Sequence, residues 1–363
     1  MNKLGFGFLR LPKNHDQYDM DTLNQMVDLY LSQGRNYFDT CYTYLKGNSE
    51  LMLKKCVVER YPRETYQIAD KLPGYMCKCE EDNLKYFNEE LERCGVDYFD
   101  VYMLHWLNEE NYQIAQRYHQ FEFIQGLKEK GLAKRIGFSY HDSADLLDTI
   151  LKEHPEIDVV QLQINYLDWE SQGIQSQKCY EVCKKYKKSI IVMEPVKGGS
   201  LALLPKEAEA VLKQIHPDWS SAKWALAFVE SLDQVEICLS GMNSITQMQE
   251  NLLDFDPLNK QEIELLAKIV EMIKKNTAIQ CTGCRYCVDH CPKGILIPDY
   301  FAMYNELYRY PSEDWKVIPS YIQMTKKAGK AQACIQCGSC ARHCPQHLEI
   351  PALMKDVSKV LDA

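Results

Sequence analysis

Residues 99–139 read FDVYMLHWLNEENYQIAQRYHQFEFIQGLKEKGLAKRIGFS, and this stretch decides the fold class. The apolar run over 99–104 has the length and residue types of a buried strand, and the amphipathic pattern Glu110–Lys130 is typical of a helix. Gly131 stands where a helix C-cap belongs, and a second apolar run follows over 135–139. A strand, a helix and another strand in this order predict parallel pairing through a right-handed crossover.

The same alternation recurs along the first 275 residues. Helical patterns such as Asp21–Ser32, Glu80–Cys94 and Ser220–Ser231 separate further short apolar runs. The strand candidates lie at residues 6–8, 36–39, 66–70, 99–104, 135–139, 158–162, 190–193 and 236–239. Such units repeated over roughly 250 residues predict an α/β fold of the (β/α)8 TIM-barrel type. A doubly wound sheet is the alternative, but no Gly-x-Gly-x-x-Gly follows the first strand.

Composition and charge exclude several classes of function. The chain has 363 residues and a formal net charge of −9, so it lacks the basic balance that a nucleic-acid partner requires. No run of about 18 apolar residues occurs, so we expect no membrane-spanning segment. The first residues, Met1–Pro12, lack the features of a secretory signal, which favours a cytoplasmic protein.

Half of the sixteen cysteines fall into two tight runs near the C-terminus. The runs consist of Cys281, Cys284, Cys287 and Cys291, and of Cys334, Cys337, Cys340 and Cys344. Each has the spacing C-x2-C-x2-C-x3-C-P of bacterial ferredoxins, in which the fourth cysteine ligates the other cluster. We therefore assign Cys281, Cys284, Cys287 and Cys344 to one [4Fe-4S] cluster and Cys334, Cys337, Cys340 and Cys291 to a second. Zinc is the alternative, but zinc sites rarely have this spacing.

An internal repeat supports a separate cluster domain. Residues 291–298 recur as residues 344–351, an offset of 53 residues that all eight cysteines of the runs share. The intervening stretch Asp299–Arg309 has a helical pattern and is longer than the spacer of a compact β-rich ferredoxin. An apolar-periodic helix over Lys260–Lys275 precedes the first run. We therefore expect a barrel over residues 1–275 and an α-helical ferredoxin-like domain over residues 276–363.

Polar side chains follow most of the predicted strands. They are Asp39, Lys71, His105, Ser139, Gln161 with Asn165, Glu194 and Ser240. Because barrel enzymes carry their chemistry at the carboxyl ends of the strands, this set predicts an active site at one rim. Cys41 lies in the loop after the second strand, where we expect it to pack.

Four residues near this rim, Asp39, Tyr44, Lys71 and His105, resemble the catalytic tetrad of the aldo-keto reductases in order, strand position and approximate spacing. The resemblance covers about residues 1–275. It implies a nicotinamide cofactor, NAD(P)H, and a small-molecule carbonyl or alcohol substrate. The residues that it places near the cofactor are Ser139, Gln161, Asn165, Lys197, Gly198, Gly199, Ser240, Gly241, Gln247, Glu250 and Asn251. The glycines among them would let backbone amides approach a phosphate closely.

The physical chemistry of carbonyl reduction suits the same four residues. Hydride addition leaves charge on oxygen, which needs a proton and hydrogen-bond donors. A phenol is a poor acid at neutral pH, but a nearby ammonium lowers its pKa. We therefore expect Tyr44 to deliver the proton beside Lys71, Asp39 to balance the charge of Lys71, and His105 to donate to the substrate oxygen.

The sequence departs from the family where the nicotinamide cofactor is usually held. Met193 replaces an aromatic residue that often stacks on nicotinamide, and Tyr140 replaces a common asparagine. Gln247 stands where a basic residue often contacts the 2′-phosphate of NADPH. These departures remove features that the family uses to bind nicotinamide, and the one at Gln247 argues against a preference for NADP.

The two predicted chemistries transfer electrons differently, because a reductase moves a hydride and a [4Fe-4S] cluster passes one electron at a time. Our leading interpretation is a cytoplasmic iron–sulfur oxidoreductase from an anaerobe that interconverts a carbonyl and an alcohol. One alternative is a reductase driven by a flavin such as FMN, or by an external donor such as ferredoxin or flavodoxin, at the same rim. The other is an electron-transfer adaptor with a non-catalytic barrel.

Overall fold

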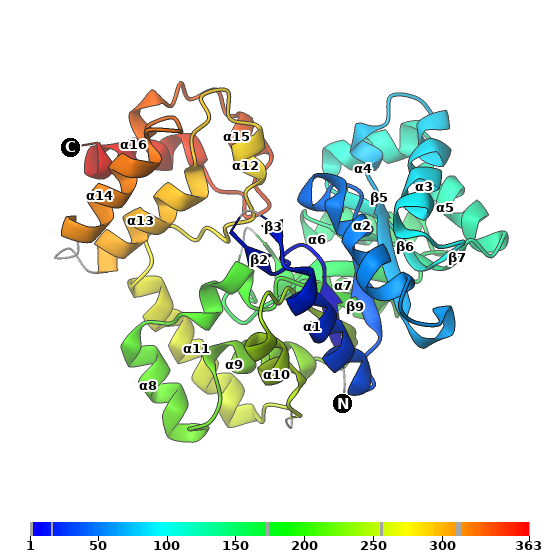
Figure 1. The fold of residues 1–363 in the computed structure, drawn as a ribbon, viewed down its shortest axis with the longest axis horizontal. Helices are drawn as coiled ribbons and strands as arrows, with labels where there is room; N and C mark the ends of the chain where they lie inside the picture. The colour runs from blue at the N-terminus through cyan, green and yellow to red at the C-terminus, as the bar shows by residue number, and fades with distance from the viewer. Residues whose placement is uncertain (1–2, 16, 172–173, 255–256, 310–313, 363) are drawn as a thin grey trace. The chain divides into compact units, whose positions relative to one another are not determined.

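The computed structural model describes residues 3–15, 17–171, 174–254, 257–309 and 314–362. The chain forms two compact units (Figure 1). The first comprises Met1–Pro195 and Lys223–Leu258, and the second comprises Val196–Ala222 and Asn259–Ala363. We describe each unit by itself.

The first unit contains a closed barrel of eight parallel strands, which confirms the predicted (β/α)8 class (Figure 1). The order around the barrel is β1-β10-β9-β8-β7-β6-β5-β4, and β1 closes it by pairing with β4. The strands are β1 Leu4–Gly7, β4 Tyr37–Asp39, β5 Gln67–Leu72, β6 Phe99–Leu107, β7 Ala133–Tyr140, β8 Val159–Gln163, β9 Ser189–Met193 and β10 Val235–Ser240. Each predicted strand overlaps one of them.

Helices follow most of the barrel strands, as the alternating pattern predicts. They are α1 Met20–Ser32, α2 Asn48–Leu53, α3 Glu81–Cys94, α4 Glu109–Arg117, α5 Gln120–Glu129, α6 Ala144–Glu153, α7 Ser176–Lys185, α9 Ser221–Glu230 and α10 Ile245–Leu252. A short hairpin, β2 Lys13–Asn14 and β3 Gln17–Tyr18, precedes α1. Among the described residues, no helix is both long and apolar enough to cross a membrane.

The predicted helix Glu110–Lys130 is two helices in the structure, α4 and α5. His119 between them has a φ of 50°, a left-handed conformation that cannot continue a right-handed helix. The carbonyl of Tyr118 accepts a hydrogen bond of 2.8 Å from the side-chain amide of Asn83, which satisfies a group that the break exposes. The amphipathic pattern spans the break because both helices bury apolar residues, among them Tyr112 of α4 and Ile124 of α5.

Strand periodicity places the polar residues that matter for function. In β5, Ala69 and Lys71 lie on one face and Asp70 lies on the other, because side chains alternate along a strand. Ala69 belongs to a buried apolar cluster that several barrel strands build together. The cluster consists of Tyr37, Ala69, Val101, Met103, Val159, Ile191 and Leu239. Lys71 therefore follows this apolar layer toward the carboxyl end of the strand, on the face that points into the barrel.

The second unit is helical, which agrees with the predicted α-helical character of the cluster domain. Its helices are α8 Lys206–Ile215, α11 Lys260–Lys275, α12 Tyr286–Asp289, α13 Ile297–Arg309, α14 Asp314–Met324, α15 Ser339–Arg342 and α16 Ile350–Leu361. The sequence repeat reappears in the structure, because the offset of 53 residues relates α12 to α15 and α13 to α16. The two helices of each such pair also contact one another. Aromatic residues such as Tyr300, Phe301 and Tyr321 fill the core between these helices.

Candidate functional site

Asp39 and Lys71 form a buried ion pair at the ends of the neighbouring strands β4 and β5. The ammonium of Lys71 donates to both carboxylate oxygens of Asp39 at 2.8 Å and to the backbone oxygen of Thr40 at 2.7 Å. Lys71 is 0% and Asp39 2% exposed. Burial raises the pKa of the Asp39 carboxyl, and the Lys71 ammonium opposes that effect. Three acceptors satisfy the ammonium, as a buried charge requires.

Tyr44 lies beside this ion pair, at the start of the 3-10 turn Tyr44–Gly47. The Lys71 ammonium is 5.1 Å from the centroid of the Tyr44 ring. The next residues, Leu45 and Lys46, have left-handed φ values of 54° and 59°, so the chain turns sharply after the tyrosine. The structure thus places the Tyr44 ring beside Lys71.

The pKa of Tyr44 differs from the expectation. Burial holds it well above the ordinary value for a phenol, and the Asp39 carboxylate raises it further. In the structure, burial and the Asp39 carboxylate outweigh the lowering influence that the sequence predicts for the Lys71 ammonium. The phenol of Tyr44 is therefore protonated in the folded protein.

His105 completes the group of four from strand β6. The pairing of β6 with β7 shifts in register between Leu104 and Leu107, and Trp106 has a φ of 61°. Such a bulge re-aims side chains, and bulges are common next to active sites. The His105 ring meets the Tyr44 ring edge-on, with 5.9 Å between centroids. Burial, followed by the Lys71 charge, lowers the pKa of His105 well below its usual value, so the imidazole is neutral.

The first group of predicted cofactor-binding residues lies on strands β7 and β8. Ser139 and Gln161 are paired in register on these adjacent strands, and both are 1% exposed. The hydroxyl of Ser139 accepts a hydrogen bond of 2.7 Å from the backbone amide of Trp106, so it also supports the bulge beside His105. The Oε1 atom of Gln161 is buried and has no hydrogen-bond partner among the described residues. That atom is an acceptor that a carboxamide N–H of a bound cofactor would satisfy.

Asn165 follows β8 and is tied to a residue that sequence reasoning missed. Its side-chain amide donates to Asp168 Oδ2 at 2.9 Å and to the backbone oxygen of Glu194 at 3.2 Å. Gln163 donates to the same oxygen of Asp168 at 3.2 Å. The backbone amide of Asp168 also donates to Asn165 Oδ1 at 2.9 Å. Asp168 therefore positions the loop after β8, and an acidic residue three positions after Asn165 is the signal that could have identified it.

The second group of predicted cofactor residues lies after β10. Asn251 of α10 donates to the hydroxyl of Ser240 at 3.0 Å, which links this helix to the end of the strand. Gln247 accepts the amide of Asn243 at 2.8 Å and is exposed, as are Gly241 and Glu250. A Cβ atom built on Gly241 would lie 3.6 Å from the Cβ atom of Arg10, so the two residues are neighbours. Sequence reasoning did not single out Arg10.

The third group, Lys197 to Gly199, belongs to the second unit and contacts the cysteine runs there. The ammonium of Lys197 donates to Gln346 Oε1 at 2.6 Å, and Lys197 is 2% exposed. A Cβ atom on Gly198 would lie 2.0 Å from the backbone oxygen of Thr282, so only glycine permits this approach. Gly198 therefore has a packing role, whereas nothing lies within 4 Å of a Cβ atom built on Gly199.

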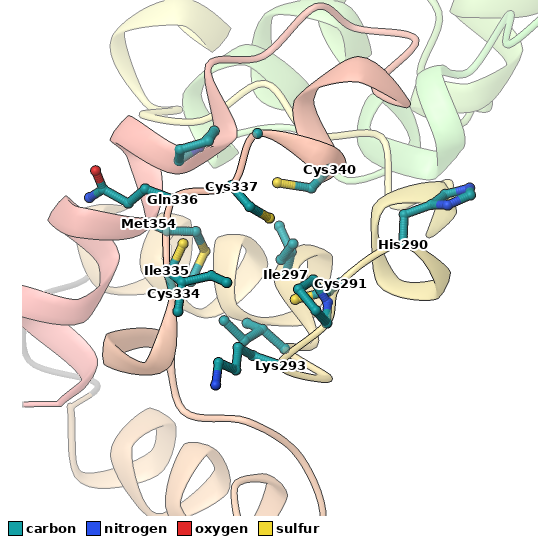
Figure 2. A pocket seen from close by; sticks show the side chains of 14 residues that line it. His290, Cys291, Lys293, Ile297, Cys334, Ile335, Gln336, Cys337, Cys340 and Met354 are labelled. Carbon is teal, nitrogen blue, oxygen red and sulfur yellow. The ribbon is translucent and has the colours of Figure 1, made fainter.

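The eight clustered cysteines gather around two cavities in the second unit. Cys291, Cys334, Cys337 and Cys340 line one cavity together with apolar residues (Figure 2). Cys281, Cys284, Cys287 and Cys344 line the other. Each cavity is therefore surrounded by three cysteines of one run and the fourth cysteine of the other run, the grouping that the crossed ligation predicts.

The surroundings of these cavities suit iron–sulfur clusters. Four thiols face each cavity, and Ile295, Ile297 and Met354 line the first while Phe301 and Ile350 line the second. The amide of Gly283 donates to Cys281 Sγ at 3.4 Å, a contact of the kind that tunes a cluster's reduction potential.

The two runs also meet through a pair of histidines. His290 and His343 each precede the fourth cysteine of a run, and their rings stack at 3.5 Å with an angle of 11°. The sequence repeat is thus a local symmetry in the structure.

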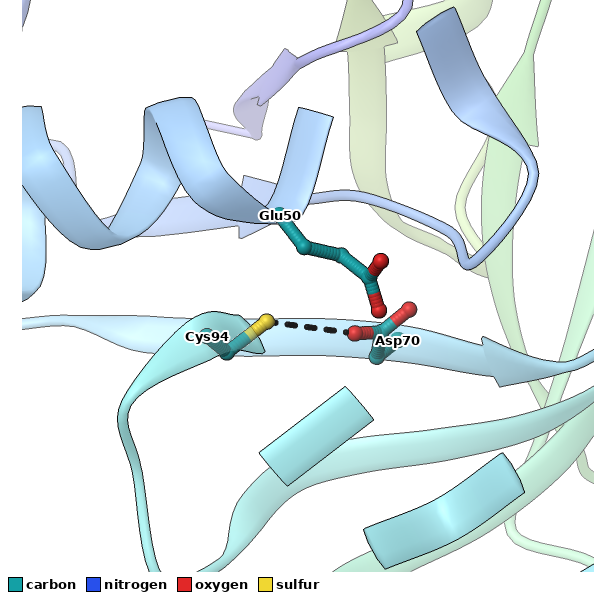
Figure 3. A group of neighbouring side chains, drawn as sticks. All are labelled: Glu50, Asp70 and Cys94. Atoms are coloured by element: carbon teal, nitrogen blue, oxygen red, sulfur yellow. Dashed lines mark hydrogen bonds between the residues drawn. The ribbon is translucent and has the colours of Figure 1, made fainter. Parts of the chain in front are cut away.

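On the outer face of β5, Asp70 belongs to a buried acidic cluster with Glu50 and Cys94 (Figure 3). Glu90 is also buried and is close enough for the charges of Asp70 and Glu50 to raise the pKa of its carboxyl. Cys94 donates to Asp70 Oδ2 at 3.4 Å, and the guanidinium of Arg93 is 3.2 Å from Glu50 Oε2. The side-chain oxygen and sulfur atoms of Glu50, Asp70 and Cys94 lie within 4.8 Å of one another. At this spacing, either a bound cation or shared protons would balance the charge of the carboxylates. Burial raises the pKa of Asp70 to about 7 and that of Glu50 to about 9. We therefore expect the cluster to hold protons at neutral pH.

Comparison with known families covers most of the chain. Residues 3–271 match the model of the aldo/keto reductase family, and residues 280–348 match a 4Fe-4S dicluster domain. Among curated proteins, an aldo-keto reductase from Mycobacterium avium is 28% identical over 130 residues, which are 36% of this chain and 43% of that protein. The NADH-specific methylglyoxal reductase of Escherichia coli is 27% identical over 154 residues, covering 37% of this chain and 45% of that protein. The chain thus spans less than half the length of the curated relatives it matches.

Solved structures show the same fold. An aldo-keto reductase from Bacillus halodurans superposes with a TM-score of 0.60 at 22% identity, covering 74% of this chain and 91% of that one. An aldo-keto reductase from Klebsiella pneumoniae in complex with NADPH has a TM-score of 0.61 at 18% identity, with coverage of 74% and 91%. At these identities the likeness concerns the barrel fold.

Proposed function

The chain belongs to the aldo/keto reductase family and is an oxidoreductase with an iron–sulfur domain, and from this premise we propose that it interconverts a carbonyl and an alcohol at the tetrad Asp39, Tyr44, Lys71 and His105. The proposal extends to a nicotinamide cofactor and to electron transfer through two [4Fe-4S] clusters. It also divides the chain into a catalytic domain over residues 1–275 and a cluster domain over residues 276–363.

The observation that carries the proposal is the buried ammonium of Lys71 beside Tyr44. An ion pair in the interior has a large desolvation cost, and a core of apolar residues would be at least as stable. A barrel that keeps Lys71 fully buried against Asp39, 5.1 Å from a phenol ring, therefore keeps it for a chemical purpose. Charge placed near a reacting oxygen in a low-dielectric site stabilises the transition state strongly.

The protonation states of the tetrad suit the reduction direction. Tyr44 is a neutral phenol and holds the proton that an alkoxide product would take. An alkoxide is a stronger base than a phenolate, so this transfer is downhill even from a phenol of raised pKa. The Lys71 ammonium then stabilises the phenolate that remains. His105 is neutral and donates one hydrogen bond to the substrate oxygen without transferring its proton.

A nicotinamide bound at the rim would supply the hydride. Gln161 carries a buried acceptor that has no partner in the described part of the chain, and Ser139 lies beside it in register, so these two side chains would hold the carboxamide. The exposed amide of Gly241 beside Arg10 and the hydroxyl of Ser240 would face the phosphates. The relative from Klebsiella pneumoniae was solved with NADPH, which supports a cofactor of this class.

The cysteine runs would hold clusters that exchange single electrons with an external donor such as ferredoxin or flavodoxin. Cys281, Cys284, Cys287 and Cys344 would ligate the first, and Cys291, Cys334, Cys337 and Cys340 would ligate the second. Anaerobically purified protein should contain about eight iron and about eight sulfide per chain. A reproducible content of half that amount would contradict two clusters.

The tetrad is tested by the variant Tyr44→Phe, with methylglyoxal as the carbonyl probe and NADH or NADPH as reductant. Loss of the phenolic proton should lower kcat by about 100-fold or more. Tyr42→Phe is the matched control, because the Tyr42 hydroxyl lies in the same loop and bonds to Glu89 at 2.6 Å. Turnover of Tyr44→Phe within threefold of the unchanged protein would refute the proposed role.

The role of the clusters is tested with reduced methyl viologen as a one-electron donor. We expect Cys281→Ala to abolish viologen-driven turnover and to spare turnover driven by NADH or NADPH. Cys183→Ala, a buried cysteine of α7, is the control for a general effect of losing a thiol. Viologen-driven turnover that survives in Cys281→Ala would show that the clusters do not supply electrons to the barrel.

A further inference from the structure

The thiol of Cys41 contacts the imidazole of His105. Cys41 Sγ lies 3.1 Å from His105 Nδ1 and 4.0 Å from His105 Nε2. Cys41 is 0% and His105 7% exposed, so water does not compete for this contact. The sequence assigned Cys41 a packing role, but its sulfur lies at hydrogen-bond distance from a ring nitrogen of the tetrad.

The other neighbours of the His105 ring do not select one of its two nitrogens. Tyr44 and Tyr75 contact it ring to ring, with centroids 5.9 Å and 5.8 Å away. The backbone after His105 is held separately, because the amide of Trp106 donates to Ser139 Oγ. Within the described part of the chain, Cys41 is thus the residue whose hydrogen bond distinguishes Nδ1 from Nε2.

Both partners of this hydrogen bond are neutral. Burial lowers the pKa of His105, and the nearby Lys71 ammonium lowers it further. Burial raises the pKa of the Cys41 thiol, against the influence of Lys71 and with that of Asp70. The Cys41–His105 contact is therefore a thiol–imidazole hydrogen bond rather than an ion pair.

The direction of this bond determines the tautomer of the histidine. A thiol sulfur is a weak acceptor, whereas the unprotonated nitrogen of a neutral imidazole is a good one. The favourable arrangement has the Cys41 S–H donating to Nδ1, which leaves the ring hydrogen on Nε2. The reverse arrangement would leave Nε2 with a lone pair, which cannot donate to a carbonyl oxygen.

We propose that Cys41 is a positioning residue that holds His105 in the tautomer with its hydrogen on Nε2, so that the ring can donate to the substrate oxygen. This inference rests on the proposed function, since the tautomer affects turnover only if His105 is the donor. Thr43 supports the arrangement from the same loop, with its hydroxyl 3.5 Å from Cys41 Sγ. The loop that follows Asp39 thereby contributes Tyr44 to the site and orients His105 as well.

Three variants test the role in turnover of methylglyoxal. Cys41→Ala removes the donor and should lower kcat by about 10- to 100-fold, with KM changed by about twofold at most, because donation to the oxygen matters most in the transition state. Cys41→Ser keeps an X–H donor and should retain kcat within about threefold. Cys56→Ala is the packing control, because Cys56 is also 0% exposed and its sulfur contacts the backbone of Leu53.

A measurement independent of activity reads the tautomer directly. In protein labelled with 15N-histidine, the nitrogen chemical shifts of His105, assigned with His105→Gln, should show a single tautomer protonated at Nε2. Cys41→Ala should shift them toward a mixture, and Cys41→Ser and Cys56→Ala should not. Protonation at Nδ1 in the unchanged protein, or shifts that Cys41→Ala leaves as they are, would overturn the inference.

The two readouts separate this inference from the proposed function. If Tyr44→Phe stays active while Cys41→Ala loses the Nε2 tautomer, the proposed chemistry fails and the positioning of His105 stands. If Tyr44→Phe is inactive while Cys41→Ala keeps both kcat and tautomer, the chemistry stands and the inference about Cys41 fails.

Discussion

The buried acidic cluster behind the tetrad makes stability depend on pH in a direction that can be measured. In the folded chain the pKa of Asp70 is about 7, against 3.8 for an ordinary aspartate, because the carboxyl is buried. The folded protein therefore binds this proton more tightly than the unfolded chain does. The stability that this bound proton contributes is fully present below about pH 4 and is lost as the pH rises toward 7. Deprotonation of Glu50 extends the loss toward about pH 9.

The size of the effect follows from the difference in pKa. About three pH units at about 1.4 kcal/mol each amount to about 4 kcal/mol for Asp70 alone. We do not add Glu50, since the two groups titrate together. The variant Asp70→Asn removes this titration and keeps an oxygen that can accept the amide of Lys71, which lies 2.8 Å from Asp70 Oδ1. Asp70→Asn should thus match the unchanged protein below about pH 4, exceed its stability by about 1.6 kcal/mol at pH 5, and exceed it by up to about 4 kcal/mol near pH 9.

The assay is the melting temperature of both proteins, measured anaerobically by circular dichroism at several pH values between 5 and 9. For a unit of this size, 4 kcal/mol corresponds to a difference of about 8 °C or more. Glu236→Gln is the control, because the pKa shift of Glu236 has the opposite sign to that of Asp70. Burial raises the pKa of Glu236, but Arg135, which donates to both carboxylate oxygens at 2.6 and 2.9 Å, outweighs it and the net shift is downward.

Two results would contradict a buried Asp70 that is protonated at neutral pH. A difference between Asp70→Asn and the unchanged protein that stays constant from pH 5 to pH 9 would mean that Asp70 does not titrate in this range. A protein that gains stability as the pH rises would mean that the carboxylates are ionised and neutralised by a bound cation.

Three further predictions concern the other contacts described above. Gly198→Ala places a Cβ atom 2.0 Å from a backbone oxygen at a φ of +64°. This substitution should lower the free energy of unfolding by at least about 1 to 3 kcal/mol and lower the iron content. Gly126→Ala is the control, because open space surrounds its Cβ atom, and it should change neither quantity. Cys291→Ser should damage the cluster of the second cysteine run, as electron paramagnetic resonance would show, and loss of the other cluster's signal alone would contradict crossed ligation. Lys71→Met should lower the free energy of unfolding in urea by about 3 to 5 kcal/mol, because the Asp39 carboxylate is left unpaired. Adding Asp39→Asn should recover part of that loss. Unchanged stability in Lys71→Met would contradict a buried ion pair.

The local pattern of the sequence determined the fold class and the composition of the main sites. Strand and helix periods depend on near neighbours in the chain, so the alternation of apolar runs and amphipathic segments is sufficient to predict a parallel barrel. The cysteine spacing likewise specifies its chemistry locally, and crossed grouping follows from the same motif. Asp39, Lys71 and His105 could be named because each stands at the end of a predicted strand, whereas Tyr44 was named through the resemblance to the aldo-keto reductases.

The tertiary structure decided the electrostatics and the partners of these residues. The pKa of Tyr44 depends on how deeply the loop is buried and on the Asp39 carboxylate, and neither is visible in a stretch of sequence. The single helix expected over Glu110–Lys130 is broken because His119 adopts a left-handed conformation that the apolar period does not reveal.

The contacts of Cys41 with His105 and of Lys197 with Gln346 join residues 64 and 149 positions apart in the chain. Sequence spacing fixes side-chain direction only within one helix or strand, whereas such contacts depend on how distant segments pack. Desolvation follows the same rule, because every surrounding atom contributes to it. Residue types and their order therefore came from the sequence, and their protonation states, partners and tautomers came from the fold.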